Sequence, residues 1–496
     1  MSLFLGLDLG TSSLKAVLFD PDQRAVIGVG SEEYPILRPK PNYAEQDPDQ
    51  WWQAAISATR RAIEQSGRSD ISAIGFSGQM HGTVLVDAQG RPVHPAIIWA
   101  DQRATVDDIG EMVDSTRVGD GDYFRFTGAL PCLGFMGATL YWLSRHAQEI
   151  LAAAHHVMLP KDYLRFKLTG EIGTEVSDAA STGIFNIHEK RWMHEFLDTW
   201  GIPLGLFPPV AASSAVAGFV TREAADALGI APGVPVVYGA ADQPAQAIGN
   251  GLIAPGRMSI TIGSGGQVFT PMRVGLGEQV KTDWRLMVFN HAVPDTYYAE
   301  AAILSAGLSL RWLRGIVGLE GHPDAYPILS AEAAPIPPGA DGLRFLPSLI
   351  DERNPWARQA TSLFGGGFSG LKLHHTRGHM ARAVMEGVAF AIKEQVEIIQ
   401  TMTEKPSSVI AAGGAMDSAV WRGILADVLD LPLTRSVMSE QAGLGAALIA
   451  AVGVGYWKTF EQACADVVRY GEVTEPDRAH AQSYAEQYQQ WSAIRK

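Results

Sequence analysis

The sequence predicts an α/β protein made of two similar halves that face each other across a cleft. The first observation is the alternation of short apolar runs with helical stretches along the chain, which is typical of α/β architecture. The second is a pair of glycine- and serine-rich loops, Gly10–Ser13 and Gly263–Gly266, which lie about half the chain apart. Each loop follows one strand-like run and precedes another. Chance similarity of two short loops is the alternative explanation.

Composition indicates a folded protein and excludes some classes of partner. The chain has 496 residues, of which 47% are hydrophobic and 19% charged, enough for two or three domains with packed cores. A net charge of −14 gives no general attraction to nucleic acid or to an anionic membrane. The longest apolar stretch, residues 442–457, is shorter than the roughly 20 residues that span a bilayer. We therefore expect a cytoplasmic protein in which Cys132 and Cys464 are unpaired thiols.

The first half begins with a predicted hairpin. Apolar runs at 3–7 and 14–19 flank the first glycine loop, and a third strand is expected at 25–29. Asp47 or Asp49 is expected to cap a helix that begins near Gln50. Further elements are expected as a strand at 71–76, strands at 83–86 and 97–99 that continue the same sheet, and mainly helix over 106–168.

The second half repeats the pattern of strands and helices. The apolar run 234–238 leads to Asp242, and the run 258–262 leads to the second glycine loop. The expected later elements are a strand at 409–412 that enters Gly413–Gly414, and helices at 418–429 and 443–453. The tail from residue 477 is expected to be helical. Its Tyr484, Tyr488 and Trp491 recur at helical spacing, which predicts an apolar stripe that docks on the body of the protein.

Two stretches match motifs whose usual function we do not expect. Residues 365–370 read G-x-G-x-x-G, but no clear strand precedes them and no helix opens from them, so a surface turn is expected instead of a dinucleotide site. His374, His375 and His379 resemble a metal cluster, yet no cysteine or carboxylate lies near them in the sequence. We expect the polar start of a helix capped by Thr376.

Asp8 follows the first predicted strand and precedes a Gly-Thr-Ser turn. As a functional residue it would organise Mg²⁺ beside phosphates that bind to the amides and hydroxyls of Thr11 and Ser12. As a structural residue it would close the hairpin in an Asx-turn. Lys15 could add positive charge to this site, although strand alternation would equally allow it to face solvent.

Asp242 follows an apolar run and a few small residues, and Pro244 comes soon after it. It could be the N-cap of the following helix, or a carboxylate beside a cleft that receives the proton of a hydroxyl group, and these two interpretations are compatible. Met80 and His81 follow the strand at 71–76. They would stand at the edge where open α/β sheets bind ligands, with ordinary packing as the alternative.

Together and in this order, these stretches resemble the FGGY family of carbohydrate kinases along nearly the whole chain. The matching stretches are Asp8–Ser12, Glu45–Pro48 with Trp51 and Trp52, Gly78–Gly82, Trp99–Arg103, Leu159–Tyr163, Ser177–Ala180, Ser305–Gly307 with Trp312, and Gly413–Gly414 with Ser418. The chain departs from the family pattern in two places. Ser264 replaces a common threonine but keeps its hydroxyl, and Asp351 and Asn354 replace glycine and threonine.

The resemblance implies two actin-like, ribonuclease-H-type α/β domains that flank a catalytic cleft. The domains would span 1–245 on the sugar side and 246–455 on the nucleotide side, and a helical extension at 456–496 would pack on the body. Asp242 is implied as the general base, and Asp8 and Asp242 as the carboxylates near Mg²⁺. The implied sugar contacts are Gln79, Met80, His81, Asp242 and Gln243. The implied ATP contacts are Thr11, Ser12, Lys15, Gly263, Ser264, Gly307, Arg311, Gly414 and Ser418.

The implied activity is the ATP-dependent phosphorylation of D-xylulose at its C5 hydroxyl, in pentose catabolism. The base would be an aspartate of ordinary pKa, about 3.9, that takes the proton late in the reaction. Met80–His81 argues against glycerol, because glycerol kinases of the family carry Arg-Glu at this turn. The alternatives are a kinase for another ketopentose, such as ribulose, or for a sugar alcohol, and an actin-like nucleotide-dependent switch. Whether the chain forms a homodimer stays open.

Overall fold

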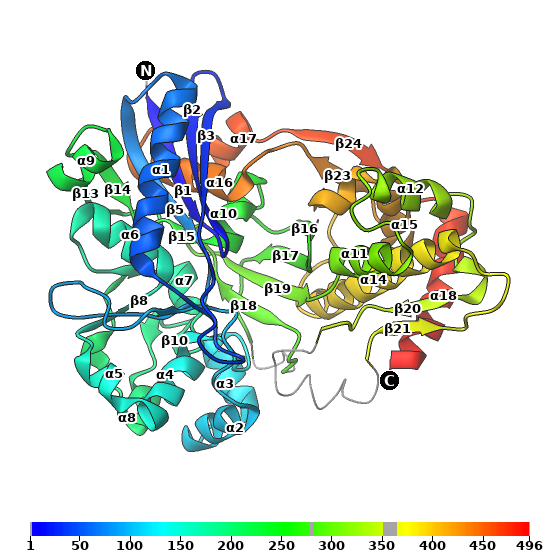
Figure 1. Ribbon diagram of the computed structural model, residues 1–496, viewed down its shortest axis with the longest axis horizontal. Helices are drawn as coiled ribbons and strands as arrows, with labels where there is room; N and C mark the ends of the chain where they lie inside the picture. The colour runs from blue at the N-terminus through cyan, green and yellow to red at the C-terminus, as the bar shows by residue number, and fades with distance from the viewer. Residues whose placement is uncertain (1, 278–281, 351–364, 496) are drawn as a thin grey trace.

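The computed structural model describes residues 2–277, 282–350 and 365–495 (Figure 1). The predicted departure at 351–355 lies outside these ranges. Two mixed sheets of seven strands each form the two halves of the molecule, with helices packed around them. The α/β architecture expected from the sequence is therefore confirmed.

The first sheet is built on the hairpin that the sequence predicts. Strand β1 pairs antiparallel with β2 and parallel with β5, and the sheet order is β13-β14-β5-β1-β2-β3, with β15 beside the end of β5. The strands are β1 (Leu3–Leu9), β2 (Ser13–Asp20), β3 (Ala25–Glu33), β5 (Ile71–Gly78), β13 (Val216–Phe219), β14 (Pro235–Val237) and β15 (Ala240–Ala241).

The second sheet repeats the connectivity of the first. Strand β16 pairs antiparallel with β17 and parallel with β22, in the order β18-β19-β17-β16-β22-β23-β24. Its strands are β16 (Arg257–Ile262), β17 (Gly266–Met272), β18 (Met287–Asn290), β19 (Tyr297–Ile303), β22 (Ser408–Ala412), β23 (Leu433–Ser436) and β24 (Tyr470–Thr474). The two glycine loops thus close equivalent hairpins, and chance similarity no longer explains them.

Helices cover both faces of the first sheet. Helix α1 (Pro48–Ser66) packs on β2 and β3, whereas α16 (Gln441–Gly453) packs on β1 and β5 from the other face. The approach of α16 is so close that a Cβ on Gly6 would lie 1.9 Å from the carbonyl oxygen of Gly443. A helix from near the end of the chain therefore completes the core of the first half.

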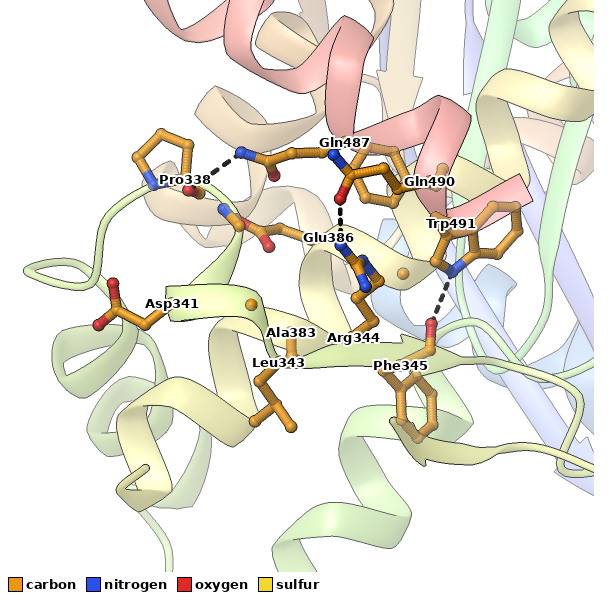
Figure 2. Close-up of a pocket in the computed structure, with 14 residues that line it drawn as sticks. Pro338, Asp341, Leu343, Arg344, Phe345, Ala383, Glu386, Gln487, Gln490 and Trp491 are labelled. Atoms are coloured by element: carbon orange, nitrogen blue, oxygen red, sulfur yellow. Dashed lines mark hydrogen bonds between the residues drawn. The ribbon is translucent and has the colours of Figure 1, made fainter. Parts of the chain in front are cut away.

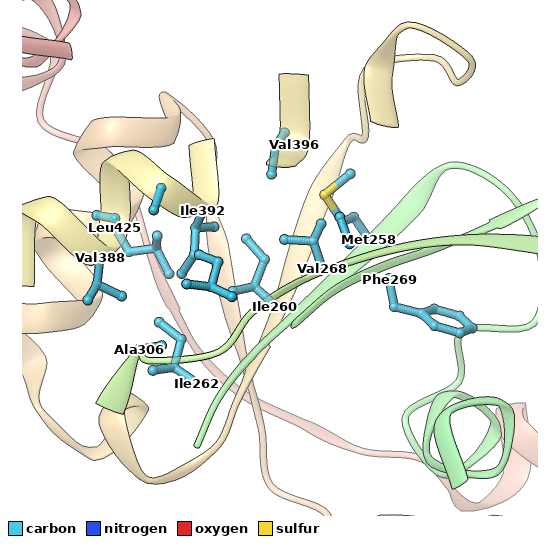
Figure 3. Packing of buried hydrophobic residues seen from close by; sticks show 14 of the residues in the cluster. Met258, Ile260, Ile262, Val268, Phe269, Ala306, Val388, Ile392, Val396 and Leu425 are labelled. Atoms are coloured by element: carbon cyan, nitrogen blue, oxygen red, sulfur yellow. The ribbon is translucent and has the colours of Figure 1, made fainter. Parts of the chain in front are cut away.

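The second sheet packs on the long helix α14 (Arg377–Gln400). Figure 3 shows Val388, Ile392 and Val396 of this helix above the buried side chains of Ile260 and Val268.

The other helices of eight or more residues in the described ranges are α2 (Val106–Ser115), α3 (Asp120–Thr127), α4 (Met136–His146), α6 (Pro160–Thr169), α10 (Asp242–Gly249), α11 (Gly307–Ile316), α12 (Ala325–Ala333), α15 (Ala419–Leu429), α17 (Phe460–Val467) and α18 (Arg478–Arg495). The shorter helices are α5 (Gln148–Ala153), α7 (Val176–Ala180), α8 (His194–Trp200) and α9 (Arg222–Leu228).

Short strands account for the main error in the predicted fold. The strands expected to continue the first sheet are β6 (Val84–Val86) and β7 (Ala96–Ile97), but β6 pairs with β8 (His156–Met158) and β7 with β4 (Glu45–Gln46) in separate ribbons. The remaining short strands are β9 (Thr174–Glu175), β10 (Phe185–Asn186), β11 (Arg191–Trp192), β12 (Val210–Ala211), β20 (Arg344–Leu346) and β21 (Gly367–Ser369). Strand β21 falls in the G-x-G-x-x-G stretch and pairs with β20, where a surface turn was expected.

The C-terminal helix docks as its apolar stripe predicts. Tyr484 and Trp491 of α18 are fully buried, and the Trp491 indole N–H donates to the carbonyl oxygen of Phe345 (Figure 2). Glu386 of α14 accepts hydrogen bonds from Tyr484 and from the buried Arg382. A cavity of about 150 Å³ lies beside this network. The polar pairing holds α18 in one register on the second half.

Candidate active site

Three neighbouring strands end at the same edge of the first sheet and bring the predicted catalytic residues together. In the register of the sheet, Ser77 of β5 lies opposite Asp8 of β1 on one side and opposite Ala240 of β15 on the other. Gln79 follows β5 directly, and Asp242 follows β15. Because these strands are parallel, their carboxyl ends meet at one edge, where such sheets bind ligands.

Asp242 is the first residue of α10, and Ala241 is the N-cap, so Asp242 itself does not cap the helix as one interpretation expected. Burial raises the pKa of the Asp242 carboxyl to about 8, with Asp8 and Glu300 adding like-charge repulsion. The expectation of an ordinary aspartate pKa is therefore wrong. Glu300 lies on β19 of the second sheet and is 4% exposed. Nothing in the sequence near Asp242 could indicate this partner, which comes from the other half.

Asp8 sits on β1 with its carboxylate anchored to the neighbouring strand. The Ser77 hydroxyl donates to Asp8 Oδ1 at 2.8 Å. Burial raises the pKa of Asp8, the Ser77 hydrogen bond and Lys15 oppose this rise, and Glu440 adds to it. The Lys15 ammonium is 2.8 Å from the Glu440 carboxylate at the start of α16. Lys15 thus lies near Asp8, but its partner in this structure is a residue that sequence reasoning missed.

The first glycine loop is held by hydrogen bonds from two other segments of the first half. The indole N–H of Trp99 donates to Thr11 Oγ1 at 2.8 Å, and Gln46 Nε2 donates to the Thr11 carbonyl at 2.7 Å. Gln46 Oε1 also accepts from Gln79 Nε2 at 2.9 Å. Ser12 next to Thr11 is exposed. Gln46 and Trp99 stand in stretches that match the family, yet their contacts with Thr11 span too many residues to be read from spacing.

The turn after β5 adopts a conformation that is rare for a side-chain-bearing residue. His81 has a φ of 70°, which is the left-handed region that favours glycine. Its Nδ1 is 2.6 Å from the carbonyl oxygen of Ser181, and its ring stacks on Phe135 at 4.1 Å between centroids. Met80 beside it is 6% exposed. Such strained backbone persists where the surroundings fix it, often at functional sites.

One cavity in the second half contains all the residues there that the family resemblance assigns to the nucleotide. The cavity has a volume of about 840 Å³, and its predicted members are Gly263, Ser264, Gly307, Arg311, Gly414 and Ser418. The start of α11 closes on the second glycine loop, since the amide of Gly307 donates to the Gly263 carbonyl at 3.1 Å. A side chain at position 307 would lie 2.1 Å from that same oxygen, so only glycine fits there.

The cavity also contains residues that sequence reasoning missed. Arg314 lies over the ring of Tyr326 at 5.3 Å from its centroid, and the hydroxyl groups of Ser330 and Ser418 are 2.6 Å apart. The missed residues are Arg314 of α11 and Tyr326 and Ser330 of α12, which share no motif with the predicted Ser418. Gln243, predicted to contact sugar, is half-buried and lines a different, small polar cavity with Gln246 and other residues of α10, β16 and β17.

The acidic edge of the first sheet fits a divalent cation. Asp8 and Asp242 repel each other and Glu300 repels Asp242, whereas Lys15, which lowers the pKa of Asp8, already pairs with Glu440. Bound Mg²⁺ commonly uses one or two carboxylates together with substrate phosphates. Asp8 and Asp242 could supply such ligands. The three histidines lie elsewhere, at the start of α14, where Thr376 is the N-cap as expected.

Known proteins and protein-family models match this chain along nearly its whole length. The family model described as "FGGY family of carbohydrate kinases, N-terminal domain" matches residues 3–249, and the C-terminal domain model of the same family matches residues 267–454. A xylulose kinase of Staphylococcus epidermidis is 34% identical over 496 residues, covering 99% of this chain and 96% of the relative. The xylulose kinase of Escherichia coli is 34% identical, with 91% of this chain and 90% of the relative covered.

Solved structures agree with these sequence matches. The crystal structure of xylulose kinase from Rhodospirillum rubrum superposes with a TM-score of 0.90 at 32% identity, covering 99% of this chain and 98% of that chain. Within the residues that the structure describes, no helix is long and apolar enough to cross a membrane.

Proposed function

Because the chain belongs to the FGGY family of carbohydrate kinases, we propose that it transfers the γ-phosphoryl group of ATP to the C5 hydroxyl of D-xylulose in pentose catabolism. The observation that carries this proposal is the meeting of Asp8, the Gln79–His81 turn and Asp242 at one edge of the first sheet. The names of the xylulose kinases to which the chain is similar, together with the Met80–His81 pair, favour D-xylulose. Membership of a kinase family favours an enzyme over a nucleotide-dependent switch.

In the proposed reaction Asp242 receives the proton of the attacking hydroxyl. The C5 oxygen forms a bond to the γ-phosphorus as the bond to the β-phosphate oxygen breaks, giving D-xylulose 5-phosphate and ADP. A carboxylate whose pKa is about 8 in the substrate-free protein is a much better proton acceptor than an ordinary aspartate, provided that it is ionised. The hydroxyl is still far less acidic than this carboxyl, so the proton moves late, as the new bond to phosphorus acidifies the oxygen.

Phosphate would be held between the two glycine loops. Thr11, Ser12 and Lys15 would approach it from the sugar side, in residues 1–245, while the predicted members of the large cavity would hold the nucleotide in residues 246–455. Mg²⁺ held by Asp8 and Asp242 would supply positive charge to the phosphate oxygens. Gln79, Met80, His81 and Gln243 would orient the sugar. The C-terminal extension at 456–496 would stabilise both halves, since Trp457 and Phe460 share a core cluster with Phe4 of the first sheet, whereas α18 docks on the second half.

The substrate is tested by a panel of sugars in a coupled assay of ADP release. We expect D-xylulose to give the highest kcat/KM, well above D-ribulose, xylitol and glycerol. A preference for ribulose or for a sugar alcohol would support the kinase activity but would contradict D-xylulose as its substrate. ATP consumption that does not respond to any sugar would contradict the kinase assignment at this site.

The role of Asp242 is tested by Asp242→Asn. Loss of the general base should lower kcat by roughly 10²- to 10⁴-fold, while the KM for D-xylulose changes much less because the asparagine can still form a hydrogen bond to the hydroxyl. Asp226→Asn is a matched control, since Asp226 is exposed on α9. Retention of more than about a tenth of the wild-type kcat by Asp242→Asn would exclude the base assignment.

A further inference from the structure

The short helix α7 and its C-cap contact two segments of the proposed active site: the one that carries Asp242 and the turn that carries His81. At its beginning, Ser177 Oγ accepts a hydrogen bond from the amide of Ala241 at 3.1 Å, and Ala241 directly precedes Asp242. At its end, the carbonyl oxygen of Ser181 is 2.6 Å from His81 Nδ1. Ser177, Ala241 and Ser181 are all fully buried. Helix α7 therefore fixes the spacing between the segment that carries the base and the turn that faces the sugar.

The direction of the hydrogen bond at Ser177 is set by its neighbours. The Ser177 hydroxyl has one hydrogen, which it donates to Glu175 Oε1 at 2.9 Å, so its oxygen is free to accept from Ala241. A hydroxyl that donates to a carboxylate is polarised and becomes a better acceptor. Glu175 Oε2 accepts from the amide of Ser177 at 2.8 Å and from the Ser213 hydroxyl at 2.5 Å. Hydrogen bonds thus connect Glu175 through the Ser177 hydroxyl to the amide of Ala241 without a break.

A buried cluster of charges anchors α7 in place. The Lys161 ammonium lies 2.8 Å from Asp162, 3.3 Å from Asp178 and 3.5 Å from Glu175, and all four side chains are fully buried. Lys161 belongs to α6, which approaches β5 so closely that a Cβ on Gly78 would lie 2.7 Å from Lys161 Cβ. Buried charges are tolerated only with fixed partners. The cluster therefore holds α7 rigidly against the strand that leads to the sugar turn.

At the other end of α7, the hydrogen bond to His81 sets the state of that ring. A carbonyl oxygen can only accept, so Nδ1 of His81 must carry the proton. Stacking on Phe135 fixes the plane of the same ring. The carbonyl at the end of α7 thus determines the tautomer of His81, and together with Phe135 it determines the orientation of the ring. At the other end of α7, the Ser177 side chain restrains Ala241, the residue before Asp242.

We infer that Ser177 is a positioning residue that acts through Asp242, with α7 as the spacer between the proposed base and the sugar turn. This inference rests on the proposed role of Asp242. If it is correct, removing the Ser177 acceptor loosens Asp242 without changing the contacts to the sugar. A misplacement of about 1 Å at a reacting group can cost roughly 100-fold in rate. We therefore expect Ser177→Ala to lower kcat by about 10- to 100-fold while the KM for D-xylulose changes by less than about threefold.

The variants are chosen to separate positioning from folding. Ser177→Cys keeps the size of the side chain but offers a poor acceptor, so it should lose activity like Ser177→Ala even if the alanine variant folds badly. Thr182→Val is the control. Thr182 lies just beyond the end of α7 and is also fully buried, and its hydroxyl donates to the carbonyl of Ala179 in that helix. Its hydroxyl also accepts from the amide of Ile184 at 3.4 Å, so both of these hydrogen bonds stay within residues 179–184, and the kcat of Thr182→Val should stay near wild type.

A double-mutant cycle decides whether Ser177 acts through the base. In the Asp242→Asn background, Ser177→Ala should cause no further loss of kcat, because the group that it positions is already gone. An equal fold-loss in both backgrounds, or a full kcat in Ser177→Ala and Ser177→Cys, would overturn the inference. If Asp242→Asn itself keeps its activity, the proposed base is wrong. If Asp242→Asn loses activity and the Ser177 variants do not, only the positioning role is wrong.

Discussion

The carboxyl of Asp242 lies among other acids, and this neighbourhood determines how the site should respond to pH. Asp8 comes from the adjacent strand of the same sheet, and Glu300 comes from β19 of the other sheet. Burial raises the pKa of Asp242 most, and the two carboxylates raise it further. The ionised form of Asp242, which the proposed reaction needs, is therefore disfavoured in the substrate-free protein at neutral pH.

Glu300→Gln should move the acid limb of the pH profile to lower pH. The wild-type kcat/KM for D-xylulose should rise with pH until Asp242 is ionised, near its pKa of about 8. Removing the negative charge of Glu300 lowers that pKa, so the variant becomes active at lower pH than the wild type. The measurement is kcat/KM between pH 5 and about 9 at fixed ionic strength. Glu223→Gln on the exposed start of α9 is the control, and an acid limb that does not move in Glu300→Gln would contradict the coupling.

At this scale the sequence could identify residues but not their partners. Asp8, Asp242 and the Met80–His81 turn follow recognisable strands, so their meeting at one edge could be predicted from the α/β pattern. The pairing of Lys15 with Glu440, the pKa of Asp242 and the Ser177 contact could not. Each depends on residues far away in the chain that meet only after packing, and no local spacing encodes such contacts.

Helix α16 illustrates how closely elements approach one another around the site. A Cβ on Gly445 would lie 1.8 Å from the carbonyl oxygen of Ala245, in the helix that begins with Asp242. By contrast, a Cβ on Gly423, in the middle of α15, would meet nothing within 4 Å. The two glycines look alike in the sequence, since both interrupt runs of good helix formers. Only the structure separates a glycine required by packing from one that is not.

Alanine at these two glycines should therefore have opposite effects. Gly423→Ala should stabilise the protein by up to about 1 kcal/mol, because alanine favours the helix. Gly445→Ala should destabilise it by about 1–3 kcal/mol through overpacking, and kcat should fall because α10 must shift. Calorimetric unfolding and the kinase assay measure both effects. A gain in stability for Gly445→Ala would show that α16 and α10 can separate at no cost.

Among the elements, long periodic segments were predictable and short ribbons were not. The hairpins around both glycine loops, helix α15 and the docked α18 follow strong local patterns, and the structure confirms them. Strands β6 and β7 were expected in the main sheet because they are apolar. They pair instead with β8 and β4. A strand of two or three residues carries too little pattern to specify its partner, so tertiary packing decides the pairing.

At the scale of the whole molecule, the two sheets share one connectivity, but the proposed nucleotide and sugar sites lie in different halves. The residues lining the large cavity all lie between Ile262 and Trp421, in the second half. The residues proposed to bind sugar belong to the strand ends of the first sheet. Transfer of a phosphoryl group requires the attacking oxygen to come within about 3–3.5 Å of the phosphorus. We therefore expect the two halves to approach each other when both substrates are bound.

We expect this closure to appear as a smaller radius of gyration in solution scattering. The decrease should require D-xylulose together with Mg²⁺ and a non-hydrolysable ATP analogue, because each ligand alone contacts mainly one half. Closure also excludes water, which limits hydrolysis of ATP in the absence of sugar. Glycerol in place of D-xylulose is the control ligand and should leave the radius unchanged. An unchanged radius with both substrates bound, as verified by calorimetric titration, would mean that the halves are already at their catalytic separation.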